Sequence, residues 1–125
     1  MARLEHVNIT VSDPGATAGW LGAVFGWPVR WKGGSIHGGT SWHVGGAEDY
    51  VAFYAPPKPT EAAAESYFVH GGLNHVGVVV DDLDAAEARV TEAGFVPHSH
   101  ADYEPGRRFY FHDGDGIEWE VVSYG

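Results

Sequence analysis

The chain has 125 residues, of which 44% are apolar and 19% charged, as is typical of a single globular domain. Acidic residues outnumber basic ones by 17 to 7, and the formal charge of −10 opposes binding to nucleic acid, whose phosphates are also negative. The absence of cysteine excludes disulfides, thiolate metal sites and thiol nucleophiles. No apolar run reaches the roughly 18 residues of a membrane span, and none has the form of a signal peptide. We therefore expect a cytoplasmic protein that binds neither membranes nor nucleic acid.

The first half of the chain predicts a strand, a helix and three further strands. "LEHVNITVSD" alternates polar and apolar residues with the period of a strand. Asp13 followed by Pro14 predicts the start of a helix, and Gly26 predicts its end. Three short, aromatic-rich segments follow, each predicted to be a strand: "WPVRWKGG", "GGTSWHVGG" and "DYVAFYAP".

The second half repeats this order. A strand in "LNHVGVVVDD" precedes a helix that begins near Asp82 and ends at Gly94. Three more strands follow: "FVPHSHAD", "GRRFYFHD" and "GIEWEVVSY". The same number of residues separates His6 from His75 as separates Asp13 from Asp82, which indicates a duplicated unit.

These elements predict a single domain over residues 1–125. Its parts are a first βαβββ unit at residues 1–55, a Pro-rich and then polar linker at residues 56–71, and a second βαβββ unit at residues 72–125. Because short turns join the three strands after each helix, we expect an α+β fold with mixed sheets and the helices on one face.

Paired units of this kind, with a histidine in the first strand of each, resemble the vicinal oxygen chelate superfamily, which includes glyoxalase I, extradiol dioxygenases and fosfomycin and bleomycin resistance proteins. The segments that carry the resemblance are "LEHVNITVSDP", "LNHVGVVVDDLDAA" and "RRFYFHDGDGIEWEVV". The resemblance implies two sheets that curl around a central cavity, with helices outside. It also implies a homodimer, a small-molecule substrate, and a divalent metal ion held by His6, His75 and Glu120.

Strand alternation agrees with an inward-facing Glu120, because Trp119 and Val121 form the apolar face on either side of it. When the two units are aligned, Glu120 falls on Ala52, where glyoxalase I-like members carry a fourth ligand. Two histidines and one carboxylate remain. This is the facial triad of non-haem iron sites, which leaves coordination positions open for a substrate with two adjacent oxygens.

The triad predicts a metal-dependent enzyme of the glyoxalase or dioxygenase type, that is, a lyase or isomerase or an extradiol-type dioxygenase. Fe²⁺ or Mn²⁺ is the expected ion, with Zn²⁺ or Ni²⁺ as alternatives. The alternative function is a metal-independent protein that binds and sequesters a small molecule such as an antibiotic, as bleomycin-resistance members do. A decayed metal site on a scaffold protein is a third interpretation.

Strand alternation also predicts which other side chains reach the cavity. The expected substrate contacts are Trp42, Ala52, Tyr54 and Tyr110 on the strands, and Arg107 in the loop "ADYEPGRR", which could be a lid or only a connector. The candidate catalytic groups are His98 and His100, which could bind an anion or transfer a proton, and Tyr103, which could contact the substrate from the same loop. Packing against a helix is the alternative for at least one of the aromatic residues, and a wet sheet surface is the alternative for the histidines.

Two further predictions concern the helix side of the sheets. His43 matches Phe111 in the alignment of the units, so we expect a buried structural histidine there. A ligand role for His43 remains the alternative if the register slips across the glycine-rich loops. Trp31 and Trp119 are also assigned to helix packing.

Overall fold

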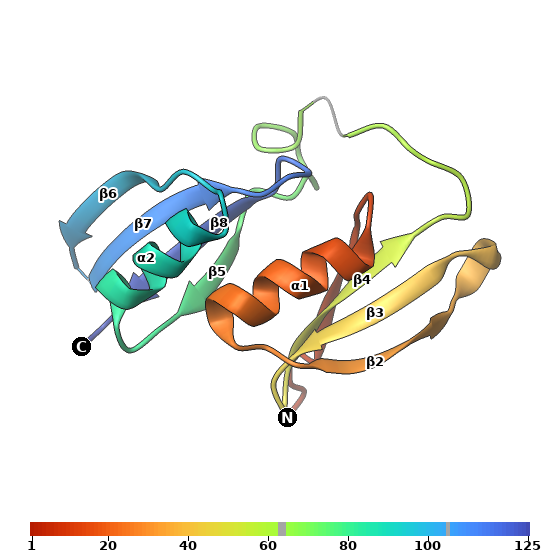
Figure 1. The fold of residues 1–125 in the computed structure, drawn as a ribbon, viewed down its shortest axis with the longest axis horizontal. Helices are drawn as coiled ribbons and strands as arrows, with labels where there is room; N and C mark the ends of the chain where they lie inside the picture. Colours follow the sequence, from red (N-terminus) through yellow and green to blue (C-terminus); the bar gives the residue numbers. More distant parts are fainter. Residues whose placement is uncertain (63–64, 105) are drawn as a thin grey trace. The chain divides into compact units, whose positions relative to one another are not determined.

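The computed structural model describes residues 1–62, 65–104 and 106–125. It divides into two compact units, Met1–Glu61 and Ala62–Gly125, each of which is described by itself (Figure 1). Residues 63 and 64 of the predicted linker, and residue 105 of the predicted loop between two strands, lie outside the described part. In the described part, no helix has the length and apolar character needed to cross a membrane.

The first unit is a mixed four-stranded sheet with one long helix. Its elements are β1 (His6–Thr10), α1 (Pro14–Phe25), β2 (Val29–Gly34), the short 3₁₀ helix η1 (Ile36–Gly38), β3 (Thr40–Gly45) and β4 (Tyr50–Ala55). The strand order is β1-β4-β3-β2, with β1 parallel to β4 and the other pairs antiparallel. Helix α1 begins where the Asp13 carboxylate accepts a hydrogen bond from the Ala16 N–H at 3.1 Å. It ends at Gly26, whose φ of 72° suits a residue without a side chain.

The second unit repeats this architecture. Its elements are β5 (Val76–Val79), α2 (Leu83–Glu92), β6 (His98–Tyr103), β7 (Gly106–His112) and β8 (Glu118–Ser123), and the strand order is β5-β8-β7-β6. The Asp82 carboxylate caps α2 by accepting a hydrogen bond from the Ala85 N–H at 3.0 Å. The predicted α+β fold with two βαβββ repeats is therefore confirmed.

One face of each sheet packs against the helix of the same unit (Figure 1). We call this side of the sheet the helix face and the opposite side the open face. The helix faces are apolar. In the first unit the largest fully buried side chains are Leu21, Val24, Val44 and Phe53, and in the second they are Val90, Phe109, Phe111, Trp119 and Val121. The assignment of Trp119 to helix packing is correct. Because side chains alternate along a strand, the polar residues next to these collect on the open faces.

The pairing of the strands fixes which residues of the two units are equivalent. His43 on β3 lies opposite Ala52 on β4, and Tyr110 on β7 lies opposite Glu120 on β8. Ala52 is thus the counterpart of Glu120, as the sequence predicts. His43, however, is the counterpart of Tyr110 and not of Phe111.

A buried carboxylate organises the turn that leads into β8. Asp113 is only 8% exposed, and its oxygens accept hydrogen bonds from the backbone N–H groups of Asp115 and Ile117 and from the Trp119 indole N–H at 3.0 Å. Burial raises the pKa of this carboxyl, and the three donors oppose that shift. The turn therefore fixes where β8 begins and which of its side chains reach the open face.

Replacing Asp113 with alanine is expected to lower the free energy of unfolding by about 2 kcal/mol, because the buried Trp119 N–H and two backbone donors lose their acceptor. Urea unfolding of the variant and of the exposed-carboxylate control Glu92→Ala measures this. Equal stability of the two variants would contradict a structural role for the Asp113 carboxylate.

Candidate metal site

Glu120 lies at the centre of a hydrogen-bonded group on the open face of the second unit. Its Oε2 accepts hydrogen bonds from Arg108 Nη1 at 2.8 Å and from the Tyr110 hydroxyl at 3.0 Å. Its Oε1 lies 3.2 Å from His75 Nε2. The Glu120 side chain is only 12% exposed, so these three neighbours replace most of its contact with water.

The neighbours keep the Glu120 carboxyl ionised. Burial by itself would raise its pKa, but the hydrogen bonds from Tyr110 and Arg108 and the nearby His75 lower it below its usual value. Burial and the Glu120 charge also raise the pKa of the Tyr110 phenol, which therefore remains a hydrogen-bond donor. The result is a fixed carboxylate with one oxygen held by two donors and the other turned toward an imidazole.

His75 is oriented by its neighbour in the chain. Its Nδ1 lies 2.6 Å from the side-chain oxygen of Asn74, which can accept the Nδ1 proton. With the Nδ1 proton held there, His75 would offer the Nε2 lone pair to a metal ion, and without an ion a protonated Nε2 can donate to Glu120. A second group that fixes the tautomer and orientation of a histidine is a regular feature of metal-binding imidazoles.

The separation of His75 and Glu120 suits two donors on one ion. Metal–nitrogen and metal–oxygen bonds of about 2.1 Å at roughly a right angle place the two donor atoms about 3 Å apart. The observed 3.2 Å between His75 Nε2 and Glu120 Oε1 is close to that value. This pair therefore fits two of the three predicted metal ligands.

His6 is oriented in a similar way on the open face of the first unit. Its Nδ1 lies 2.9 Å from Glu5 Oε1, which also accepts a hydrogen bond from the Tyr50 hydroxyl at 3.1 Å. The hydrogen bond with His6, followed by that with Tyr50, lowers the pKa of the Glu5 carboxyl, so Glu5 accepts as a carboxylate. No group of three potential ligands is gathered around one point within residues 1–62, 65–104 and 106–125. His6 belongs to the first unit and the pair to the second, so the complete triad remains a proposal.

The chain matches a family model over residues 3–121, that of the Glyoxalase/Bleomycin resistance protein/Dioxygenase superfamily. The chain belongs to this superfamily. No curated protein sequence matches the chain significantly.

Solved structures of superfamily proteins resemble the chain along its whole length. A glyoxylase/bleomycin resistance protein/dioxygenase domain from Frankia sp. EAN1pec is 21% identical with a TM-score of 0.81, covering 98% of each chain. The fosfomycin resistance protein FosX from Mesorhizobium loti is 22% identical with a TM-score of 0.75, covering 100% of this chain and 93% of that one. FosX from Listeria monocytogenes, solved with Mn(II) and sulfate, is 17% identical with a TM-score of 0.76, over 98% and 93% of the two chains. At these identities the likeness shows the superfamily fold.

Of the three aromatic residues predicted to contact the substrate, only two are on the open face. Tyr110 is there beside Glu120, and Tyr54, on the same face of β4 as Ala52, donates a hydrogen bond to the Ile36 carbonyl at 2.8 Å. Trp42 is not. It pairs with Phe53 of the helix face and would be 3.5 Å from a Cβ on Gly15 of α1. The predicted inward position of Trp42 is wrong because its strand register differs by one residue from that assumed in the sequence alignment of the units.

The same shift overturns the helix-facing position predicted for His43. The His43 ring centre lies 6.5 Å from that of His6 and 4.6 Å from that of Tyr50, on the open face. Burial, together with the charges of His6 and Arg30, lowers the pKa of His43 and favours its neutral form. Trp31, predicted to pack on a helix, instead has its ring centre 5.0 Å from that of His43.

The candidate catalytic residues His98 and His100 lie on opposite faces of the second sheet. His98 is on the open face, paired with Tyr110, with its Nε2 3.1 Å from His112 Nδ1. His100 is on the helix side, with its Nε2 2.9 Å from Glu87 of α2. The predicted inward position of His100 is wrong because the strand is irregular between His98 and Ala101, where Ser99 has a φ of 55°.

Arg108, and not the predicted Arg107, is the arginine on the open face. Arg107 forms an ion pair of 3.0 Å with Asp84 of α2, so it lies on the helix side and not at the open face. Arg108 reaches Glu120 instead, and its guanidinium carbon lies 4.8 Å from the ring centre of Tyr103. Sequence reasoning missed Arg108, although its place two residues before Tyr110 puts the two on one face.

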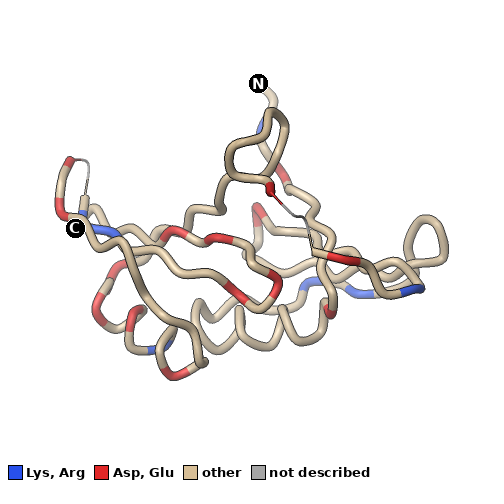
Figure 2. Tube along the Cα trace, turned by 90° about the horizontal axis from the view of Figure 1, so that it is seen from above, with Lys and Arg blue, Asp and Glu red and all other residues tan. Residues whose placement is uncertain are grey.

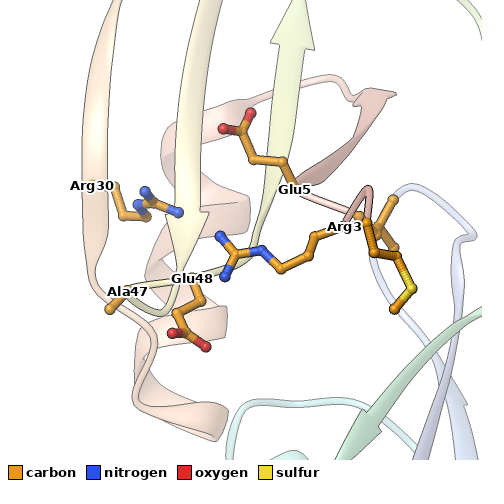
Figure 3. A pocket seen from close by; sticks show the side chains of 7 residues that line it. Arg3, Glu5, Arg30, Ala47 and Glu48 are labelled. Carbon is orange, nitrogen blue, oxygen red and sulfur yellow. The ribbon is translucent and has the colours of Figure 1, made fainter.

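A cavity of about 440 Å³ lies in the first unit near the start of β1. Its lining residues are Met1, Arg3, Leu4, Glu5, Arg30, Ala47 and Glu48. Figure 3 shows the side chains of Arg3 and Arg30 directed into it, with Glu5 and Glu48 at its sides. The predicted site residues of this superfamily member are not among those that line it.

The Tyr110→Phe variant removes one of the two donors to Glu120 Oε2, and we expect the pKa of the Glu120 carboxyl to rise. In the wild type, the lowered pKa of Glu120 stabilises the folded protein. This contribution is fully present above pH 4.5, the usual pKa of the group, and is lost as the pH falls through the lowered pKa of the folded state. Carboxyl NMR titration of metal-free protein measures the pKa. An unchanged value in Tyr110→Phe, equal to that in the control Tyr103→Phe, would contradict the role of the hydrogen bond.

Proposed function

We propose that the protein is a metal-dependent enzyme that acts on a small substrate with two adjacent oxygens. His6, His75 and Glu120 are the proposed ligands of one divalent ion. The observation that carries the proposal is the His75–Glu120 pair, whose donor atoms are 3.2 Å apart while Arg108 and Tyr110 hold the carboxylate ionised. The presence of Mn(II) in FosX from Listeria monocytogenes supports the use of a divalent metal by this superfamily.

Two neutral imidazoles and one carboxylate would leave a divalent ion with a net charge of about +1 and with open coordination positions. When bound, the ion would act as a Lewis acid and template for the adjacent oxygens of the substrate. The oxygen and nitrogen donors fit Fe²⁺ or Mn²⁺, with Zn²⁺ or Ni²⁺ as alternatives. Arg108 and Tyr110 would hold Glu120 in place, and Asn74 would do the same for His75.

The proposed reaction is a glyoxalase-like lyase or isomerase reaction or an extradiol-type dioxygenation. His98 is the candidate to move a proton, because its imidazole is on the open face beside His112 and Tyr110. The superfamily name includes enzymes and resistance proteins, and a FosX variant has been solved with Mn(II) and 1S,2S-dihydroxypropylphosphonic acid, a vicinal diol. That ligand supports a substrate with adjacent oxygens.

The proposal predicts that the wild-type protein binds one Mn²⁺ per chain and that His75→Ala and Glu120→Gln each weaken this binding by more than about 100-fold, since each removes a ligand. Equilibrium dialysis with metal analysis measures the affinity. His100→Ala is the matched control, because its imidazole pairs with Glu87 on the helix side. We expect this control to bind Mn²⁺ like the wild type.

Two results would contradict the metalloenzyme proposal. One is a wild type that binds no stoichiometric Mn²⁺, Fe²⁺, Zn²⁺ or Ni²⁺. The other is metal binding that His75→Ala leaves unchanged. Tight binding of an antibiotic by metal-free protein, without a product, would favour sequestration instead. Oxygen consumption by Fe²⁺-loaded protein with a catechol would favour the dioxygenase over the lyase.

A further inference from the structure

The open face of the first unit carries a continuous group of rings, which we call the ring platform: Trp31, His43 and Tyr50. The ring centres of Trp31 and His43 are 5.0 Å apart, and those of His43 and Tyr50 are 4.6 Å apart. The Tyr50 ring also stacks on His6 at 5.0 Å. The platform therefore adjoins a proposed metal ligand within the same unit.

The His43 imidazole is available to a ligand. In the second unit the equivalent residue, Tyr110, donates to Glu120, but the counterpart of Glu120 in the first unit is Ala52, which offers no side-chain acceptor. In the part of the chain that the structure describes, His43 has ring contacts but no side-chain hydrogen bond. The residue is partly buried, and its ring nitrogens have no hydrogen-bond partner among the described residues.

Trp31 is held flat and remains half-exposed. A Cβ on Gly33 would lie 2.7 Å from Trp31 Cζ2, so the indole lies against the strand where glycine leaves room for it. The residue is nonetheless 48% exposed. An indole fixed beside two other rings offers a preformed apolar surface on which a flat molecule can stack.

A positive charge borders the platform. The Arg30 guanidinium carbon lies 4.4 Å from the ring centre of Tyr50, and Arg30 forms no ion pair with a carboxylate among the described residues. Figure 3 shows its side chain directed into the cavity that Arg3 also lines. The Glu5 carboxylate is near enough to feel this charge but does not pair with it, so the guanidinium donors remain open to an anionic ligand.

We propose that the ring platform and Arg30 bind the planar, anionic part of the substrate, which is therefore an aromatic or similarly flat carboxylate with an oxygen next to its carboxyl group. Trp31 stacks on the plane, His43 hydrogen-bonds an oxygen, and Arg30 neutralises the charge. The inference rests on the proposed function in placing the substrate oxygens near His6. The platform itself is formed by the first unit alone.

The experiment compares two carboxylates that differ in planarity. Salicylate and cis-2-hydroxycyclohexanecarboxylate carry the same pair of oxygen groups on a six-membered ring, but only salicylate is flat. We expect wild-type protein to prefer salicylate by about three- to tenfold, the worth of one aromatic contact. Isothermal titration calorimetry is carried out on Mn²⁺-loaded and on metal-free protein, and Mn²⁺ affinity is measured separately.

The variants separate stacking from metal binding. Trp31→Ala removes the indole, and Gly33→Ala displaces it. We expect each variant to lose the preference for salicylate and to keep the Mn²⁺ affinity of the wild type. Lys32→Ala is the control on the same strand, because Lys32 lies over Trp42, 4.6 Å from its ring centre, and not on the platform. Arg30→Gln is expected to weaken binding of both carboxylates by about tenfold.

Each result decides the inference. A preference that Trp31→Ala removes supports it, whether or not metal is bound. Equal affinity for the two carboxylates in the wild type, no binding of either, or a preference that survives in both Trp31→Ala and Gly33→Ala overturns it. Absence of Mn²⁺ binding, with the platform preference intact, would refute the metalloenzyme proposal and leave the platform inference standing.

Discussion

Each sheet of this protein has a helix on one face, and this constraint decides which side chains are available for chemistry. The helix faces bury the large apolar residues, among them Phe53 and Trp119. Since side chains alternate along a strand, the polar residues between them point to the open faces. Glu120 is there because Trp119 and Val121 belong to the core, and His43 is there because Val44 does.

On the open face of the second unit, one largely covered charge governs the arrangement of its neighbours. An ionised carboxylate that is only 12% exposed requires donors, and Arg108 and Tyr110 supply them to one oxygen. The other oxygen remains for His75 and, by our proposal, for a metal ion. In the first unit alanine replaces this carboxylate, so the side chain opposite it, His43, is left without that partner. The two units share a fold but offer different chemistry.

The sequence predicted the repeat, the helices and their caps, and the equivalence of Ala52 and Glu120, because periodicity and capping residues are local signals. It placed Trp42 and His43 on the wrong faces, since a one-residue difference in the loops exchanges the two faces of a strand. An irregularity at Ser99 did the same to His100. Such shifts depend on the length of each loop and on how the strands on either side of it pair, and the alternation of residues within one strand does not encode either.

By our proposal, His6 and His75 both bind one metal ion. Pulsed electron paramagnetic resonance of Cu²⁺-loaded protein counts the imidazoles bound to the ion. We expect two in the wild type and one in each of the His6→Ala and His75→Ala variants. A count that stays the same in His6→Ala would contradict the claim, because the ion would then draw no histidine from that strand of the first unit.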